Sequence, residues 1–292
     1  MTQAIVNGLL QGGLYATIAL AFSLAWRITG VLNLAHGELV TAGAYLAWLL
    51  HSARWLPPLP SLLVVVPVLV AAGWLLERLV LRRLGAPTAG AAAAVLGTLG
   101  LSVVLQQAAR LLFSPTPHTL PLPVGGLWRV GGVTVAAGHA VLFLVAAATA
   151  GAVVVLLRAT RLGASLRAVA QNPEAARLAG IDVPRMRSLG FALCAGVAGV
   201  AGVLAGQAQP IHPAMGTPLL LGALAVTALT GPGHVTGAVL GGLALGVAEG
   251  VLGAVVPRVG ATLGVVLAAA LLVVMLVIRR DPLLATPVRG RP

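Results

Sequence analysis

Residues 165–206, SLRAVAQNPEAARLAGIDVPRMRSLGFALCAGVAGVAGVLAG, join a polar segment directly to a long apolar run. The run from 188 to 206 is almost entirely Ala, Gly, Val and Leu, and it approaches the length needed to cross about 30 Å of hydrocarbon. Its closely spaced glycines and alanines favour tight packing between helices. The polar segment carries arginines together with Glu174 and Asp182. A charged segment between apolar runs of spanning length is the pattern that decides the fold class.

The composition of the 292 residues is that of a membrane protein. Hydrophobic residues make up 59% of the chain and charged residues 8%, with a mean hydropathy of +1.03, whereas about a quarter of the residues of a soluble domain are charged. We predict an all-α polytopic membrane protein with about eight to ten transmembrane helices, some short or broken, in a single transmembrane domain over 1–292. The expected spans are roughly 5–26, 29–50, 60–81, 91–113, 139–158, 188–206, 217–230, 236–253 and 261–278. The seventh is short enough to be a half-helix.

The distribution of arginine orients these spans. A net charge of +12 would suggest a nucleic-acid partner in a soluble protein, but the arginines stand between the apolar runs and are not interleaved with aromatic residues. We therefore expect no nucleic acid. Arginines gather near 82–83, 158–187 and 279–291, which are alternate connections and therefore cytoplasmic by the positive-inside rule. The N-terminus is then outside and the C-terminus inside, with a cytoplasmic segment at about 159–187 and an external Pro/Gly-rich loop at about 114–138.

The cytoplasmic segment contains the signals of a short helix. Asn172 suits the cap position, Pro173 the first turn, and Glu174 the positive end of the helix dipole. Gly180 follows where a helix can end in the left-handed conformation. The pattern predicts a helix from 173 to about 179, preceded by an amphipathic piece near 162–169. Taken by its charges alone, the segment could also be an ordinary loop that only fixes topology.

The sequence Glu174-Ala175-Ala176-x-x-x-Gly180 resembles the core of the EAA motif in permease subunits of bacterial ABC importers. The downstream Ile-x-Leu-Pro part of the longer motif is absent. In those importers the motif forms a coupling helix that sits in a groove of a cytoplasmic ATPase. The resemblance implies that Glu174, Ala175, Ala176 and Gly180 couple to an ATPase, with Arg167 available to pair with acids on that partner.

Three longer runs resemble the branched-chain amino-acid permease family of the LivH type. They are 166–206, 7–45 with its Asn-Leu-Ala-His-Gly-Glu core, and the glycine-rich stretch 231–241. The resemblance implies a bacterial inner-membrane subunit that works by ATP-driven alternating access. It implies as partners a second related permease, two cytoplasmic ATP-binding subunits, an extracytoplasmic solute-binding protein and membrane lipid. Branched-chain amino acids are the first expected cargo, with urea, short amides or other amino acids as alternatives.

Two acids stand inside apolar runs, where an ionised carboxylate costs a few kcal/mol unless it is paired or solvated. They are Glu38 and Glu249; the other acids, Glu77 included, are expected at cytoplasmic edges or loops, where a charge costs little. Asn33, His36 and Glu38 stand close together at a predicted break in a helix, and we expect them to line the translocation path or its gate. Alternatively, Glu38 pairs with His36 or an arginine and only holds helices together. Glu249 could face the same path or cap an interface, and we favour the structural role.

Other functions find little support in the sequence. There is no GxxxxGK[ST] loop, no HExxH pair and only one cysteine, so we expect no enzyme, no metal site and no cofactor. A rival hypothesis is a stand-alone secondary transporter or channel that uses Glu38 and Glu249 as proton or ion sites. Co-purification of an ATPase that depends on Ala175 and Gly180 would distinguish the importer from this rival.

Overall fold

The computed structural model of the chain describes residues 1–84, 90–114, 116–130 and 133–255, together with positions 266, 269, 270 and 274. Eight of the nine predicted spans fall in these ranges, and each corresponds to a helix, or to α3 with the π-helix after it for 60–81. The largest difference is at 29–50, where the helix begins only at His36. The ninth, 261–278, lies almost wholly outside the described residues. Among those described, six helices are long and apolar enough to cross a membrane, and the fold is that of an all-α polytopic membrane protein.

The helices follow one another along the chain with short connections. They are α1 (Thr2–Thr29), α2 (His36–Ser52), α3 (Leu62–Leu76), the π-helix η1 (Glu77–Leu81), α4 (Arg82–Leu84), α5 (Gly90–Phe113), α6 (Ala137–Ala159), α7 (Arg161–Gln171), α8 (Pro173–Leu178), α9 (Val183–Ala208), α10 (Gly216–Thr230) and α11 (Val235–Val255). One antiparallel hairpin, β1 (Leu127–Val130) and β2 (Val133–Ala136), pairs Leu127 with Ala136.

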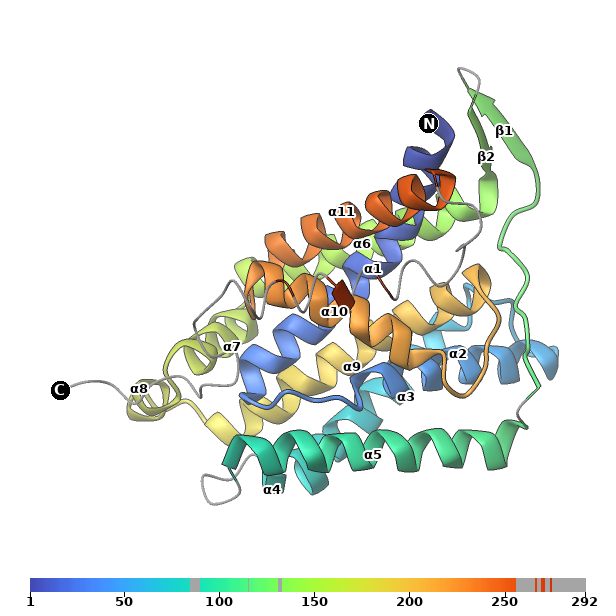
Figure 1. The fold of residues 1–292 in the computed structure, drawn as a ribbon. Helices are drawn as coiled ribbons and strands as arrows, with labels where there is room; N and C mark the ends of the chain where they lie inside the picture. The colour runs from blue at the N-terminus through green and yellow to red at the C-terminus, as the bar shows by residue number, and fades with distance from the viewer. Residues whose placement is uncertain are drawn as a thin grey trace.

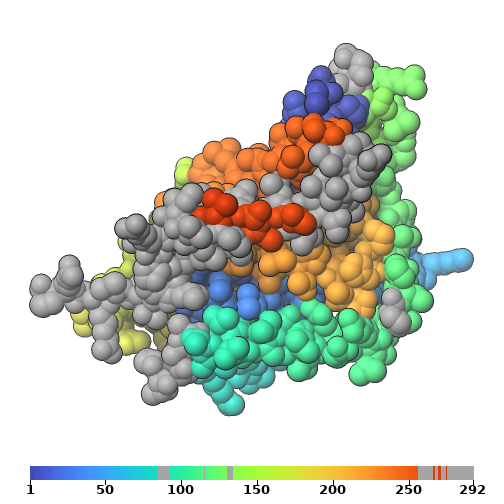
Figure 2. All heavy atoms as spheres, viewed as in Figure 1, coloured from blue at the N-terminus to red at the C-terminus, as the bar shows by residue number. Residues whose placement is uncertain are grey.

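Two helices form the centre of the bundle. In the apolar parts of α1 and α9, 67% and 78% of the residues are buried, against 17–22% for α3, α5, α6 and α11. Most of the surface of the latter four is therefore left uncovered by the rest of the described chain. Figure 1 shows α5 along one edge of the bundle, and the space-filling view shows the same helix as a continuous outer ridge (Figure 2). The hairpin lies at one end of the molecule, while α7 and α8 lie at the opposite end, which the arginine distribution assigns to the cytoplasm (Figure 1).

Glycine seams bring the backbones of these helices into contact. A methyl group on Gly8 of α1 would stand 2.5 Å from the Gly246 carbonyl oxygen of α11, and one on Gly12 would stand 2.8 Å from Leu243 Cα. On the other side of the centre, a methyl group on Gly43 of α2 would stand 2.8 Å from the Gly199 oxygen of α9. Only glycine fits at such crossings. The small-residue run in α9 thus serves packing, as its composition predicts.

The short helices α2 and α10 both begin after a non-helical stretch. Residues 30–35 precede α2 and residues 209–215 precede α10. The first turns of the two helices cross at Gly37 and Gly216, where a methyl group on Gly37 would stand 2.5 Å from the Gly216 oxygen. The broken helix predicted near 33–38 is confirmed. The short span predicted at 217–230 is also confirmed, as α10.

The loop at 114–138, which the sequence predicts to be external, contains more regular structure than its composition suggests. Its second half is the β1–β2 hairpin, which the sequence analysis did not predict. The side-chain amide of Gln3 continues the hairpin, because its nitrogen donates to the Thr134 oxygen at 2.7 Å and its oxygen accepts from the Thr134 nitrogen at 2.8 Å. In the first half, His118 exchanges backbone hydrogen bonds with Ile211 at 2.9 and 2.7 Å. These bonds tie the loop to the N-terminus and to the connection before α10.

Candidate functional site

The α7–α8 segment is built by local capping. The Thr160 hydroxyl accepts a hydrogen bond from the Gly163 nitrogen at 3.0 Å at the start of α7. The Asn172 side-chain oxygen accepts from the nitrogens of Glu174 and Ala175, both at 3.0 Å, at the start of α8. After α8 the chain turns at Gly180, whose φ is +81°. The helix predicted from 173 to about 179 is therefore confirmed, and its end lies at the expected glycine.

A small apolar cluster holds α8 to its neighbours. Val169 of α7, Ala176 of α8 and Val183 of α9 are all buried in it. Ala176 is only 4% exposed, and its carbonyl oxygen accepts from the Ile181 nitrogen at 3.0 Å. Ala176 therefore faces its own chain. The cluster fixes the angle at which α8 leaves the bundle.

The outer face of α8 is exposed and partly apolar. Leu178 is 92% exposed, and Glu174 and Ala175 are exposed beside it. Leu178 is two residues beyond the buried Ala176, so it points away from the cluster. The sequence analysis did not single out Leu178. Leu178 could have been identified from its position, because a residue two places after the buried Ala176 lies on the opposite side of the helix.

The π-helix η1 directly continues α3 at its C-terminal end. Glu77, its first residue, is 3% exposed and accepts a hydrogen bond from the Ser188 hydroxyl of α9. The expectation that Glu77 stands where a charge costs little is therefore wrong, because the bulge turns its carboxylate inward. π-Helical turns of this kind often mark functional sites. Here the turn joins the end of α3 to the start of α9.

A second polar group lies inside the bundle and is centred on Glu38 of α2. Its Oε1 accepts from the Ser102 hydroxyl at 3.1 Å and from the Gln106 side-chain nitrogen at 2.9 Å. The same Gln106 nitrogen donates to the Thr217 hydroxyl at 3.0 Å. One amide from α5 thus bridges α2 and α10, at the residues immediately after the crossing of Gly37 and Gly216. We call this set, Glu38, Ser102, Gln106 and Thr217, the amide bridge.

The expected partners of Glu38 are not those of the structure. Within the described ranges its hydrogen-bond donors are neutral, and neither His36 nor an arginine pairs with it. His36 is two residues away and points elsewhere, edge-on to the Phe22 ring of α1 at 5.8 Å between centroids. The pairing with His36 or an arginine proposed from the sequence is therefore not found among the described residues. The Glu38 carboxylate instead joins α2 to α5 through the neutral side chains of Ser102 and Gln106.

Two neighbouring groups are buried with hydrogen-bonding capacity unused in the described part of the chain. Both ring nitrogens of His36 and the side-chain nitrogen of Asn33 have no partner there. The Asn33 oxygen accepts from the Ala35 nitrogen at 3.0 Å, in the turn just before α2. Buried polar atoms are nearly always satisfied in proteins, so these nitrogens are candidates for contact with water or a solute.

Glu249 lies apart from the amide bridge. It is on α11, where its carboxyl group neighbours the Tyr15 hydroxyl of α1. One of its oxygens, Oε2, has no hydrogen-bond partner among the described residues. The structure therefore brings Glu249 to the seam between α1 and α11, away from the helices that supply the partners of Glu38.

The fold and these two polar regions define a membrane-embedded helical bundle of the transporter type, with a projecting surface helix at one end and a polar crossing inside. Residues 4–276 match the family described as branched-chain amino acid transport system / permease component, and the chain belongs to that family. It is 30% identical over 252 residues to the high-affinity branched-chain amino acid transport system permease protein LivH of Salmonella typhimurium and to that of Escherichia coli K12, covering 82% of this chain and 81% of each relative.

A third relative is the corresponding permease protein BraD of Pseudomonas aeruginosa, at 31% identity over 254 residues, 82% of this chain and 81% of the relative. No solved structure matches the chain. The apolar helices and these relatives agree on a multi-pass protein of the bacterial inner membrane with the role of a permease component.

Proposed function

We propose that the chain is the translocation subunit of an ATP-driven importer and that α8 is its contact with an ATP-binding subunit. The exposed Leu178 on a capped, anchored helix is the observation that carries this proposal. An apolar side chain that is 92% exposed beyond the membrane surface costs free energy unless a partner covers it. We assign ATP hydrolysis to separate subunits and no catalytic role to this chain.

The complete importer in this proposal contains a second related permease, two cytoplasmic ATP-binding subunits and an extracytoplasmic solute-binding protein. Each ATP-binding subunit receives one coupling helix in a groove. The exposed Glu174, Ala175 and Leu178 form the part of α8 that enters the groove. Ala176 positions the helix from the inside, and Gly180 permits the turn that returns the chain to α9. Arg167 lies on α7, outside the part of α8 that enters the groove.

A route for the mechanical signal follows from the packing. A push on α8 reaches α9 through Val169, Ala176 and Val183, which form one cluster. The rigid helix α9 then meets α2 at the Gly43–Gly199 crossing. Because α2 carries Glu38, movement of α8 changes the relation of α2 to α10. We propose that the amide bridge opens and closes with this movement. Energetic coupling over such a distance requires elements with two discrete arrangements.

The proposed path runs by the amide bridge, with Asn33 and His36 beside it. The relatives are named for branched-chain amino acids, and we propose these as the cargo. Such a solute carries one ammonium and one carboxylate group. A Glu38 carboxylate held only by neutral donors offers an acceptor to the ammonium group. Glu249 serves structure at the α1–α11 seam and is not part of this path.

Docking is tested by expressing the chain with its two ATP-binding subunits and measuring the ATPase recovered with it. We expect Leu178→Ser to lower recovery strongly while Leu178→Met, which keeps an apolar side chain, does not. Ala175→Trp should also lower recovery, because it enlarges the helix. Equal recovery with all three variants would refute the docking role of α8. Solute flux by the chain alone, independent of ATP, would favour the secondary transporter instead.

The path is tested by uptake of labelled leucine into vesicles containing the assembled importer. Glu38→Gln keeps an oxygen that can accept from Ser102 and Gln106, but it removes the charge. We expect intact assembly and much slower uptake. Glu249→Gln is the matched control and should transport at the normal rate. Uptake unchanged in Glu38→Gln would remove Glu38 from the path, and uptake of urea in preference to leucine would overturn the proposed cargo.

A further inference from the structure

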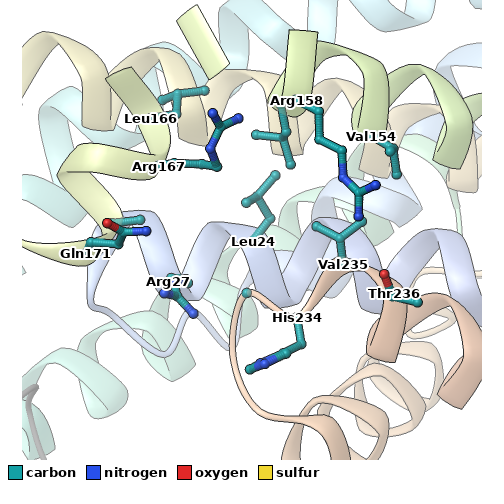
Figure 3. Close-up of a pocket in the computed structure, with 13 residues that line it drawn as sticks. Leu24, Arg27, Val154, Arg158, Leu166, Arg167, Gln171, His234, Val235 and Thr236 are labelled. Atoms are coloured by element: carbon teal, nitrogen blue, oxygen red, sulfur yellow. The ribbon is translucent and has the colours of Figure 1, made fainter. Parts of the chain in front are cut away.

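A basic pocket of about 280 Å³ opens at the cytoplasmic end of the bundle. Three arginines from three helices line it: Arg27 of α1, Arg158 of α6 and Arg167 of α7. Figure 3 shows them arranged around Leu24, with His234 from the connection before α11 nearby. Among the described residues that line the pocket there is no acid. The pocket therefore attracts anions.

An apolar cavity of about 310 Å³ adjoins this pocket. It lies between α3 and α6, and its floor is formed by α1 and α9, with Leu20, Val66 and Ala152 among its lining residues. Leu24, Leu157 and Leu166 line both cavities and pack in one apolar cluster, so apolar side chains stand between the basic pocket and the apolar cavity. The two cavities, which we call the combined space, are cationic at one end and apolar along the rest.

The charges at the mouth are available to a ligand. Arg27 makes one hydrogen bond, from its Nη1 to the Pro232 oxygen at 3.2 Å. In the described part of the chain Arg158 and Arg167 make no side-chain hydrogen bond and are exposed. Guanidinium groups bind phosphate with several donors in a fixed fork. The three arginines thus supply the chemistry for a phosphate group at the level where α6 leaves the membrane.

We propose that this combined space is a binding site for an anionic phospholipid of the cytoplasmic leaflet. Its phosphate lies among Arg27, Arg158 and Arg167, and one acyl chain lies in the cavity between α3 and α6. Basic pockets between transmembrane helices on the cytoplasmic side are suited to anionic headgroups. The bound lipid bridges α1, α6 and α7, and so steadies the segment that presents α8. A loose phosphate would satisfy the arginines but leave the apolar cavity unfilled.

The headgroup contacts are tested on the purified full chain in detergent, without ATP-binding subunits, so the outcome is independent of the proposed transport function. Native mass spectrometry measures the binding of dioleoyl phosphatidylglycerol, dioleoyl phosphatidylcholine and glycerol 3-phosphate. We expect a preference for phosphatidylglycerol, and the double variant Arg158→Gln/Arg167→Gln should weaken it about 25-fold, or about fivefold for each arginine. Arg83→Gln, which removes a cytoplasmic arginine outside the pocket, should leave it unchanged.

Three results would overturn the headgroup assignment. The first is an unchanged affinity in the double variant, and the second is an equal loss in Arg83→Gln. The third is binding of glycerol 3-phosphate as tight as that of the whole lipid, which would make the pocket a site for a free phosphate compound.

The acyl-chain contact is tested with a bulky residue placed in the apolar cavity. Ala152 lines the cavity and is exposed, so Ala152→Trp can fill it without disturbing buried neighbours. Ala148 is exposed on the same helix but does not line the cavity, and Ala148→Trp is the matched control. We expect only Ala152→Trp to weaken phosphatidylglycerol binding. Unchanged lipid binding in Ala152→Trp, or an equal loss in Ala148→Trp, would instead assign the cavity to another occupant.

Discussion

The substitution Gly37→Ala tests whether the crossing of α2 and α10 controls the polar centre of the bundle. The added methyl group would stand 2.5 Å from the Gly216 oxygen, 2.8 Å from the Gly216 carbonyl carbon and 3.1 Å from Leu220 Cβ. Ordinary contact begins at 3.4 Å. Because the two nearest atoms belong to the backbone, no side-chain rotation relieves the clash. The helices must therefore separate by about 0.9 Å, the difference between 3.4 and 2.5 Å.

This separation is larger than the lengthening that the two hydrogen bonds of Gln106 in the amide bridge can tolerate. The Gln106 nitrogen lies 2.9 Å from Glu38 Oε1 and 3.0 Å from the Thr217 hydroxyl. Either bond can lengthen by only 0.5–0.6 Å before it exceeds the 3.5 Å limit of a hydrogen bond. We expect one of the two to break. The substitution should therefore impair transport as well as stability.

The expected loss of stability is about 1–3 kcal/mol, the usual cost of overpacking. The helix preference of alanine offsets at most about 1 kcal/mol of this. Gly100→Ala in α5 is the control, since a methyl group there meets nothing within 4 Å and gains the same helix preference. Thermal unfolding of the two variants in detergent, with leucine uptake by the assembled importer, measures both effects. Equal stability and equal uptake in the two variants would refute the argument.

Three further predictions concern the cytoplasmic end of the molecule. Asn172→Ala should destabilise α8 by about 1 kcal/mol and speed hydrogen exchange of its amides, whereas Asn172→Asp should not, because it keeps the capping oxygen. Gly180→Ala should cost about 1 kcal/mol at φ +81° and lower the recovery of ATP-binding subunits, with Gly180→Asn less affected. Ser188→Ala should lower the unfolding free energy by about 1–3 kcal/mol, because the buried Glu77 loses its donor. Ser52→Ala, at an exposed helix end, should change it little.

Each of these predictions has a result that contradicts it. Identical exchange in the two Asn172 variants would mean that the cap does not stabilise α8. Gly180→Ala and Gly180→Asn with normal recovery would show that the turn tolerates any residue. A Ser188→Ala protein as stable as Ser52→Ala would mean that Glu77 is satisfied by other groups.

The sequence predicted the elements whose signals are local. Asn172, Pro173 and Gly180 define the ends of α8 because caps and left-handed turns depend on adjacent residues. The spans could be predicted because runs of spanning length are interrupted by charged, Pro-rich or Gly-rich connections, although their exact ends could not. The hairpin was missed because its two strands have four residues each, too few for a period of two to stand out.

The centre of the site depends on contacts that no local pattern encodes. Glu38 was identified as unusual from its apolar surroundings, but its partners Ser102 and Gln106 lie 64 and 68 residues away. The exposure of Leu178 and the burial of Ala176 depend on which face of α8 meets α7 and α9. Glu77 points inward because it begins a π-helix, and no sequence pattern at residues 77–81 predicts that π-helix.

The glycine seam between α1 and α11 has a consequence for how the protein is made. Gly8 and Gly246 are 238 residues apart in the chain, although their backbones touch. At about 5–20 residues per second, a ribosome needs roughly 12–48 s to travel from one to the other. During that interval α11 is not yet present, and the face of α1 that carries Gly8 and Gly12 has no α11 to pack against. A nascent chain interrupted before α11 would keep this face of α1 uncovered.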